Sequence, residues 1–183
     1  MTVVFLDRDG VINRNRDDYV KTVGELEFLP GSLEGLARLK GSGVTVVVVS
    51  NQAGVGRGLI EPIELERIDR ELSLEAERHG GEIAASFYCT HRKDEGCNCR
   101  KPQPGLFLKA SEALGFDLSD AYFVGDTASD VEAGCRAGIR TVLVLTGLAS
   151  DGDACGWQYK PDHVAVDLPS AVEWILAAEN KPH

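Results

Sequence analysis

The chain has no long hydrophobic run. The apolar residues at its start are too few for a signal peptide and are followed at once by charged residues. No later stretch approaches the roughly 20 apolar residues that a membrane-spanning helix needs. We therefore expect no membrane partner and a cytoplasmic location.

Positive charge is also in short supply. The 183 residues include 19 Lys and Arg against 29 Asp and Glu, a formal net charge of -10. Such a surface repels nucleic acid and anionic membranes, so we expect neither as a partner. A phosphorylated small molecule would have to be held by local cations, a metal ion or backbone N–H groups. The length and a hydrophobic content of 43% fit one globular domain over residues 1–183, which we expect to be a monomer.

Cysteine is scarce and unevenly placed. Three of the five cysteines fall within eleven residues, in Cys89-x-His91 and Cys97-x-Cys99. In a reducing compartment such a cluster is more typical of a metal site than of disulfides, although Cys97 and Cys99 could pair in oxidised protein. Four protein ligands match a closed, tetrahedral structural zinc site, and the alternative is a set of unrelated thiols. The zinc would order the loop 89–101, which is too polar to order itself by burial.

Short apolar segments alternate with amphipathic segments along the chain. Strands are expected at 3–6, 44–49, 83–88, 121–124, 141–145 and 164–166, and helices at 33–40, 62–79, 104–114, 128–137 and 171–178. This alternation predicts an α/β fold, a Rossmann-like parallel sheet with helices on both faces. Ser32 is expected to cap the first helix, and the glycine-rich segment 50–58 is expected to be a loop.

The sequence leaves no room for a large cap domain. A polar flap over residues 11–29 and the loops 89–101 and 146–159 are therefore expected to border the ligand site.

Chemically reactive side chains follow the predicted strands. Asp7 and Asp9 come directly after the first strand, and period-2 alternation would put both on one side with Arg8 facing away. Because ligands bind at the carboxyl ends of parallel strands, we expect further groups to converge there. Carboxylates from two strands suit Mg²⁺, and a hydroxyl and a lysine complete a site for phosphoryl transfer. These further groups are Ser50, Asn51, Lys101, Asp126 and Asp130.

The order of these residues resembles a known superfamily. Asp7-x-Asp9-Gly10, Ser50, Lys101-Pro102 and Gly125-Asp126-x-x-x-Asp130 are similar, in order, to the four motifs of the haloacid dehalogenase superfamily. The Cys/His loop, together with Ser50-Asn51-Gln52, resembles the subgroup that holds the heptose bisphosphate 7-phosphatases and the histidinol-phosphate phosphatases.

The resemblance implies a Mg²⁺-dependent phosphomonoester hydrolase that works through an aspartyl-phosphate. It assigns the nucleophile to Asp7 and the general acid and base to Asp9. It places Mg²⁺ on Asp7, the backbone carbonyl of Asp9 and Asp126, with Asp130 orienting the site from behind. Zinc would be bound by Cys89, His91, Cys97 and Cys99. Substrate binding would fall to Ser50, Asn51, Gln52, Arg57, Arg100 and Lys101.

Several interpretations stay open at this point. The resemblance favours removal of the 7-phosphate of D-glycero-D-manno-heptose 1,7-bisphosphate, with histidinol phosphate as the alternative substrate. Thr127 stands where the heptose enzymes often have a basic residue, which leaves the substrate less well defined. A phospho-accepting receiver-type switch domain would also use an aspartate, Mg²⁺, a hydroxyl and a lysine, but it has no use for a general acid at Asp9. A catalytically silent zinc-stapled binding module is disfavoured because every expected catalytic position is filled.

Overall fold

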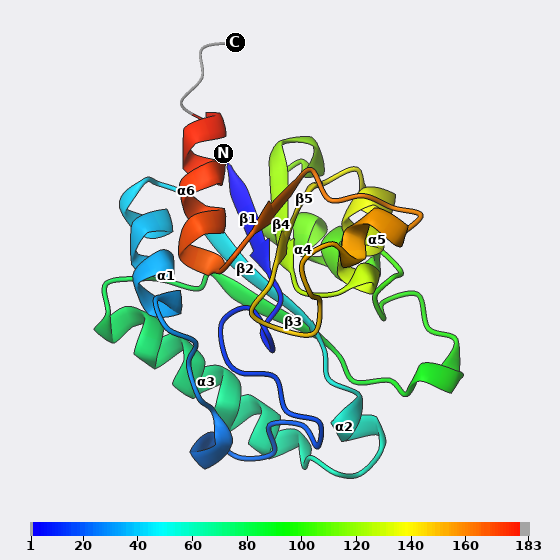
Figure 1. The fold of residues 1–183 in the computed structure, drawn as a ribbon. Helices are drawn as coiled ribbons and strands as arrows, with labels where there is room; N and C mark the ends of the chain where they lie inside the picture. Colours follow the sequence, from blue (N-terminus) through cyan, green and yellow to red (C-terminus); the bar gives the residue numbers. More distant parts are fainter. Residues whose placement is uncertain (1, 180–183) are drawn as a thin grey trace.

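The computed structural model describes residues 2–179. Within them, six parallel strands form one sheet in the order β3-β2-β1-β4-β5-β6 (Figure 1). The strands are β1 (Val3–Leu6), β2 (Thr45–Asn51), β3 (Ala85–Cys89), β4 (Ala121–Gly125), β5 (Arg140–Val144) and β6 (His163–Ala165). This arrangement confirms the predicted Rossmann-like α/β fold.

Helices cover both faces of the sheet (Figure 1). They are α1 (Ser32–Gly41), α2 (Ala53–Gly56), α3 (Pro62–Arg78), α4 (Gly105–Leu114), α5 (Ala128–Ala137) and α6 (Leu168–Glu179), with short 3₁₀ turns η1 (Val23–Glu25), η2 (Lys93–Glu95), η3 (Leu118–Asp120) and η4 (Asp153–Gly156). Val4 and Leu6 of β1 share a core with α1, α3 and α6, whereas Val3 and Phe5 share one with α4 and α5. Burial on both faces explains why the central strands are almost entirely apolar. Among the described residues, no helix has the length and apolarity to cross a membrane.

The register of the sheet brings distant segments to one edge. Leu6 at the end of β1 lies opposite Val48 on one side and Val124 on the other. The Asp7 backbone N–H then donates to the Val124 carbonyl at 2.9 Å. The strand order also reverses between β1 and β4, and such a switch point is where open α/β sheets leave a crevice for ligands. The residues that follow β1, β2 and β4 therefore meet beside this crevice.

Some element ends differ from the sequence-based expectation. Gly31, with a φ of 76°, precedes α1, so the expected cap at Ser32 is wrong. Ser32 lies inside the helix, and its buried hydroxyl has no hydrogen-bond partner within residues 2–179. Residues 53–56 form the short helix α2 where a loop was expected. Helix α6 begins three residues early because the Asp167 side chain accepts a hydrogen bond from the backbone of Ser170.

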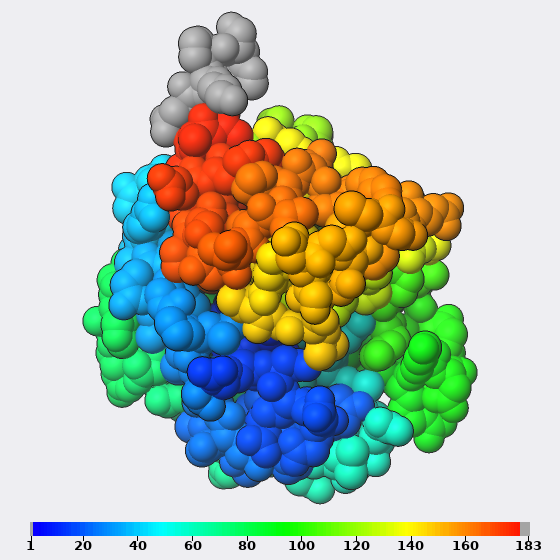
Figure 2. Space-filling view, in the orientation of Figure 1, coloured from blue at the N-terminus to red at the C-terminus, as the bar shows by residue number. Residues whose placement is uncertain are grey.

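No cap domain is inserted between the elements of residues 2–179. The regular structure of the flap 11–29 is limited to the turn η1 and to the isolated bridges of Asn13 with Asp9 and with Phe28. In Figure 2 the blue flap and the yellow segment after β5 meet on the face that is viewed. Loops rather than a second domain therefore enclose the carboxyl edge of the sheet.

The aromatic core beneath this edge generates a stability prediction. Phe107 is fully buried on α4, with its ring centroid 5.0 Å from that of Phe5 and 4.9 Å from that of Phe123. We expect Phe107→Ala to lower the free energy of unfolding by about 3–5 kcal/mol, because it removes these contacts and leaves a cavity. Urea denaturation measures the loss. The neighbouring Leu108→Ala, at a residue that is 55% exposed, should cost far less, and equal losses would contradict this description of the core.

Candidate active site

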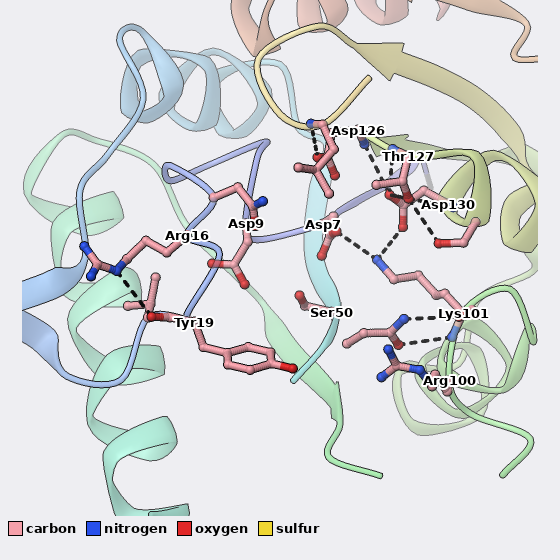
Figure 3. A pocket seen from close by; sticks show the side chains of 15 residues that line it. Asp7, Asp9, Arg16, Tyr19, Ser50, Arg100, Lys101, Asp126, Thr127 and Asp130 are labelled. Carbon is pink, nitrogen blue, oxygen red and sulfur yellow. Dashed lines mark hydrogen bonds and ion pairs between the residues drawn. The ribbon is translucent and has the colours of Figure 1, made fainter. Parts of the chain in front are cut away.

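Three carboxylates from two strand ends form the centre of the site (Figure 3). Asp7 follows β1, Asp126 follows β4 and Asp130 lies in the first turn of α5, and one oxygen atom of each lies within 4.8 Å of the others. Thr127 caps α5, and Asp130 accepts hydrogen bonds from the backbone of Thr127 at 3.0 Å and of Asp126 at 3.2 Å. Capping of the helix therefore fixes Asp130 beside the other two carboxylates.

Lys101 is the cation that faces this cluster. Its buried Nζ lies 2.6 Å from Asp130 Oδ1 and 3.1 Å from Asp7 Oδ2, and it donates to the Val49 carbonyl at 3.1 Å. Burial alone would lower the pKa of Lys101, but the two carboxylates outweigh it and raise that pKa. The lysine is therefore positively charged and firmly held.

One lysine does not balance three carboxylates. Burial raises the pKa of Asp7 to about 6, with Lys101 opposing the effect. Burial, and then the negative charges of Asp130 and Asp7, raise the pKa of Asp126 to about 8. The cluster therefore has excess negative charge when ionised. Hard carboxylate oxygens are the donors that Mg²⁺ prefers, so these residues fit a divalent cation.

Ser50 and Asn51, at the end of β2, both border the cluster. Asn51 Oδ1 accepts from the Lys101 backbone N–H at 3.1 Å, and Asn51 Nδ2 donates to the Lys101 carbonyl at 3.2 Å. The side-chain amide that was predicted to bind substrate thus fixes the backbone of the catalytic lysine candidate. Ser50 is buried, and its hydroxyl remains on the cavity wall.

The Asp9 carboxylate is surrounded by hydrogen-bond donors. One of them is Arg8, so the expectation that Arg8 faces away from Asp9 is wrong. Arg8 is fully buried, and its Nη2 lies 3.0 Å from Asp9 Oδ2. The alternation rule fails because β1 ends at Leu6, so Arg8 lies in a turn rather than a strand. Gln52, predicted to contact substrate, is only 1% exposed, and its Nε2 donates to Asp9 at 2.7 Å.

The carboxylates, Ser50, Lys101 and Asp9 line a cavity of about 230 Å³ (Figure 3). The sequence predicted that the flap borders the site, but an irregular polar segment does not reveal which of its side chains face inward. Tyr19 has a φ of 67°, which is unusual for a residue with a side chain. The inward-facing residues of the flap and of loop 146–159 are Asn15, Arg16, Tyr19, Val20 and Leu148.

A second cavity of about 580 Å³ adjoins the first and shares Tyr19 and Arg100 with it. Its remaining wall consists of Ala53, Arg57, Arg92, Lys93 and Asp94. Arg57 also donates to the Tyr19 hydroxyl at 3.0 Å. Four cations and one carboxylate therefore surround this cavity, in a chain whose net charge is -10.

The predicted Cys/His cluster is assembled in the structure. Cys99 Sγ lies 3.3 Å from Cys89 Sγ and 3.5 Å from Cys97 Sγ, and His91 Nδ1 lies 3.3 Å from Cys99 Sγ. A tetrahedral ion with bonds of about 2.3 Å to sulfur requires ligand separations of roughly 3.8 Å, close to these values. The four side chains can therefore hold a metal ion.

Comparisons with known proteins agree with this geometry. A family model described as HAD-hydrolase-like, for haloacid dehalogenase, matches residues 98–171. The chain is 44% identical over 146 residues to the D-glycero-beta-D-manno-heptose-1,7-bisphosphate 7-phosphatase of Pseudomonas aeruginosa. This match covers 80% of this chain and 82% of the relative. It is 38% identical over 176 residues to the enzyme of that name from Bordetella bronchiseptica, and this match covers 96% of this chain and 98% of the relative.

A solved structure is similar over the same length. The D,D-heptose 1,7-bisphosphate phosphatase of Bordetella bronchiseptica, complexed with magnesium and phosphate, matches with a TM-score of 0.90 and 37% identity, covering 97% of this chain and 99% of that one. By its identity and coverage, the present chain belongs to the haloacid dehalogenase-like hydrolases, within the family of these heptose-bisphosphate phosphatases.

Proposed function

We propose that this phosphatase removes the 7-phosphate of D-glycero-D-manno-heptose 1,7-bisphosphate. The observation that carries the proposal is the cationic cavity beside the carboxylate cluster. Arg57, Lys93 and Arg100 have no ion-pair partner among residues 2–179, whereas Arg92 is paired with Asp94 at 3.3 Å. Three unpaired cations fit a second, non-reacting phosphate.

Histidinol phosphate fits this cavity less well. It carries an ammonium group and only one phosphate, so the unpaired cations would repel the part of the molecule that lies outside the catalytic cavity. Thr127 lines the catalytic cavity, but we expect it to contribute little to the choice of substrate, because its hydroxyl donates to Asp130 at 2.6 Å.

The chemistry begins at Asp7. Its carboxylate attacks phosphorus, and the bond between phosphorus and the sugar oxygen breaks as Asp9 transfers a proton to that oxygen. Asp9 then takes a proton from water, whose oxygen attacks the aspartyl-phosphate and releases inorganic phosphate. Lys101 and Ser50 line the cavity where the transferring oxygens would lie, and Lys101 would stabilise their negative charge.

Two metal ions would support this site. Asp7, Asp126 and the backbone carbonyl of Asp9 would hold Mg²⁺, with Asp130 behind them, and when bound it would neutralise charge on the phosphoryl group. Zn²⁺ would be held by the Cys/His cluster, where four protein ligands leave no open position for catalysis.

The first prediction about function concerns the nucleophile. Asp7→Asn should lower kcat by at least about 10³-fold, because the amide does not form the aspartyl-phosphate. Phosphate release measures the rate, and circular dichroism should show an unchanged fold. Asp120→Asn, at an exposed aspartate in η3, is the matched control. A turnover near that of the unmodified protein would refute the role of Asp7.

A second prediction concerns the non-reacting phosphate. Arg57→Met should raise KM for heptose 1,7-bisphosphate about 10- to 100-fold, the cost of one charge-assisted contact to phosphate. KM for heptose 7-phosphate, which lacks the second phosphate, should change little. Arg70→Met, at an exposed arginine on α3, controls for the loss of one positive charge. Equal changes in KM for both substrates would contradict binding of the second phosphate by Arg57. Preferred turnover of histidinol phosphate would contradict heptose 1,7-bisphosphate as the substrate.

The metal loop generates a third prediction. Cys97→Ser should remove most of the bound zinc, because three ligands remain where a closed site needs four. Elemental analysis measures the zinc, and hydrogen exchange should show weaker protection over residues 89–101. Cys135→Ser, outside the cluster, should leave both unchanged. Purified native protein without zinc would remove the basis of this prediction.

A further inference from the structure

The carboxylate of Asp9 is held on both oxygens by buried or partly buried donors. Oδ1 accepts from Asn13 Nδ2 at 2.8 Å and from Arg8 Nη2 at 3.0 Å. Oδ2 accepts from Gln52 Nε2 at 2.7 Å and from Arg8 Nη2 at 3.0 Å. Only 21% of the Asp9 side chain stays exposed, toward the catalytic cavity.

Burying the charged side chain of Arg8 costs the fold free energy. Its side chain is fully buried, and within residues 2–179 its only ion pair is with Asp9. Its Nη1 has no hydrogen-bond partner there. Desolvating a guanidinium for one carboxylate is rarely better for stability than an apolar side chain of similar size. The placement of Arg8 is therefore better explained by what it does for Asp9 than by packing.

Gln52 completes this network. Its Nε2 contacts Asp9 and also the Ser50 hydroxyl at 3.2 Å, while its Oε1 accepts from Arg8 Nη2 at 3.1 Å. Its backbone N–H donates to the Cys89 carbonyl at 2.7 Å, which ties it to the end of β3. Both polar atoms of the side chain are thus occupied, and a connected buried network of this kind restricts its members to one arrangement.

We propose that Gln52, together with Arg8 and Asn13, is a positioning residue for Asp9 rather than a substrate ligand. Gln52 fixes the Asp9 carboxyl relative to Ser50, so that Asp9 reaches the oxygen of the departing alcohol. Proton transfer requires hydrogen-bond distance, and small displacements of a catalytic group cost a large part of the rate. This inference rests on the proposed role of Asp9 as general acid.

Leaving groups of different basicity separate positioning from substrate binding. An alkoxide is a poor leaving group and needs the proton from Asp9, whereas 4-nitrophenolate departs without it. We expect Gln52→Met to lower kcat/KM for the sugar phosphate about tenfold and for 4-nitrophenyl phosphate less than about twofold. KM for the sugar phosphate should change little, whereas loss of a substrate contact would raise it.

Three further variants complete the experiment. Gln52→Glu keeps the size of the side chain but replaces the donor to Asp9, so it should show the same selective loss even if Gln52→Met folds poorly. Asp9→Asn measures how far kcat/KM for the sugar phosphate falls when the general acid is absent. Tyr88→Phe removes a hydroxyl that donates to Asp69 but keeps the ring beside Arg8, so it should leave the ratio of kcat/KM for the two substrates unchanged.

The outcomes distinguish this inference from the proposed function. Selective loss in both Gln52 variants and in Asp9→Asn supports the positioning role. The positioning role is overturned if only Asp9→Asn loses kcat/KM selectively on the sugar phosphate, or if the Gln52 variants lose it equally on both substrates. Either result leaves the proposed function standing. Equal loss of kcat/KM on both substrates in Asp9→Asn would refute the acid role of Asp9 itself, because kcat/KM covers the departure of the alcohol and not the later attack of water. Wild-type protein inactive on heptose 1,7-bisphosphate would refute the proposed function.

Discussion

The structure depends on a concentration of negative charge at one edge of a parallel sheet. Three buried carboxylates face a single lysine, and the ion pairs of Lys101 with Asp7 and Asp130 are the contacts that keep them together. The pKa of Asp126, raised to about 8 by burial and by its neighbours, reflects the excess charge that remains. A bound cation would remove this excess, so the same groups that burden the fold create the affinity for a metal ion.

Charge of the opposite sign is distributed around this centre. The chain is acidic overall, yet the second cavity is lined by four cations, three of them without a carboxylate partner among the described residues. An anionic ligand would therefore be attracted to the rim by local cations, while its approach to the carboxylates would need the divalent ion. A chain with evenly mixed charges would not separate these two requirements in space.

The sequence predicted well that side chains at the strand ends converge, because this convergence follows from the topology of a parallel sheet. Asp7, Ser50 and Asp126 directly follow or end parallel strands, so one sheet edge had to collect them. The early start of α6 at Asp167 had a signal as well, because an aspartate followed two residues later by Pro169 is typical of a helix start.

Other features could not be read from the sequence. The inward turn of Arg8 depends on where β1 ends, and strand ends are the least certain part of a sequence-based assignment. The spacing Ser50-x-Gln52 does not distinguish a side chain facing a ligand from one facing Asp9. Both assignments need the packing of β2 against the turn after β1, which is a tertiary property.

The Cys/His loop links the two cavities. Cys99, Arg100 and Lys101 are consecutive, and the amide of Asn51 clamps the Lys101 backbone from the other side. Arg100 borders both cavities, whereas Lys101 points into the carboxylate cluster. A metal ion on Cys99 would therefore order two adjacent cations at once, and peptide geometry would set their separation. If the ligand carries two phosphates, as proposed, this fixed spacing acts as a measure of the distance between them. The Cys/His loop would then contribute to specificity, although no position on its metal is open to substrate.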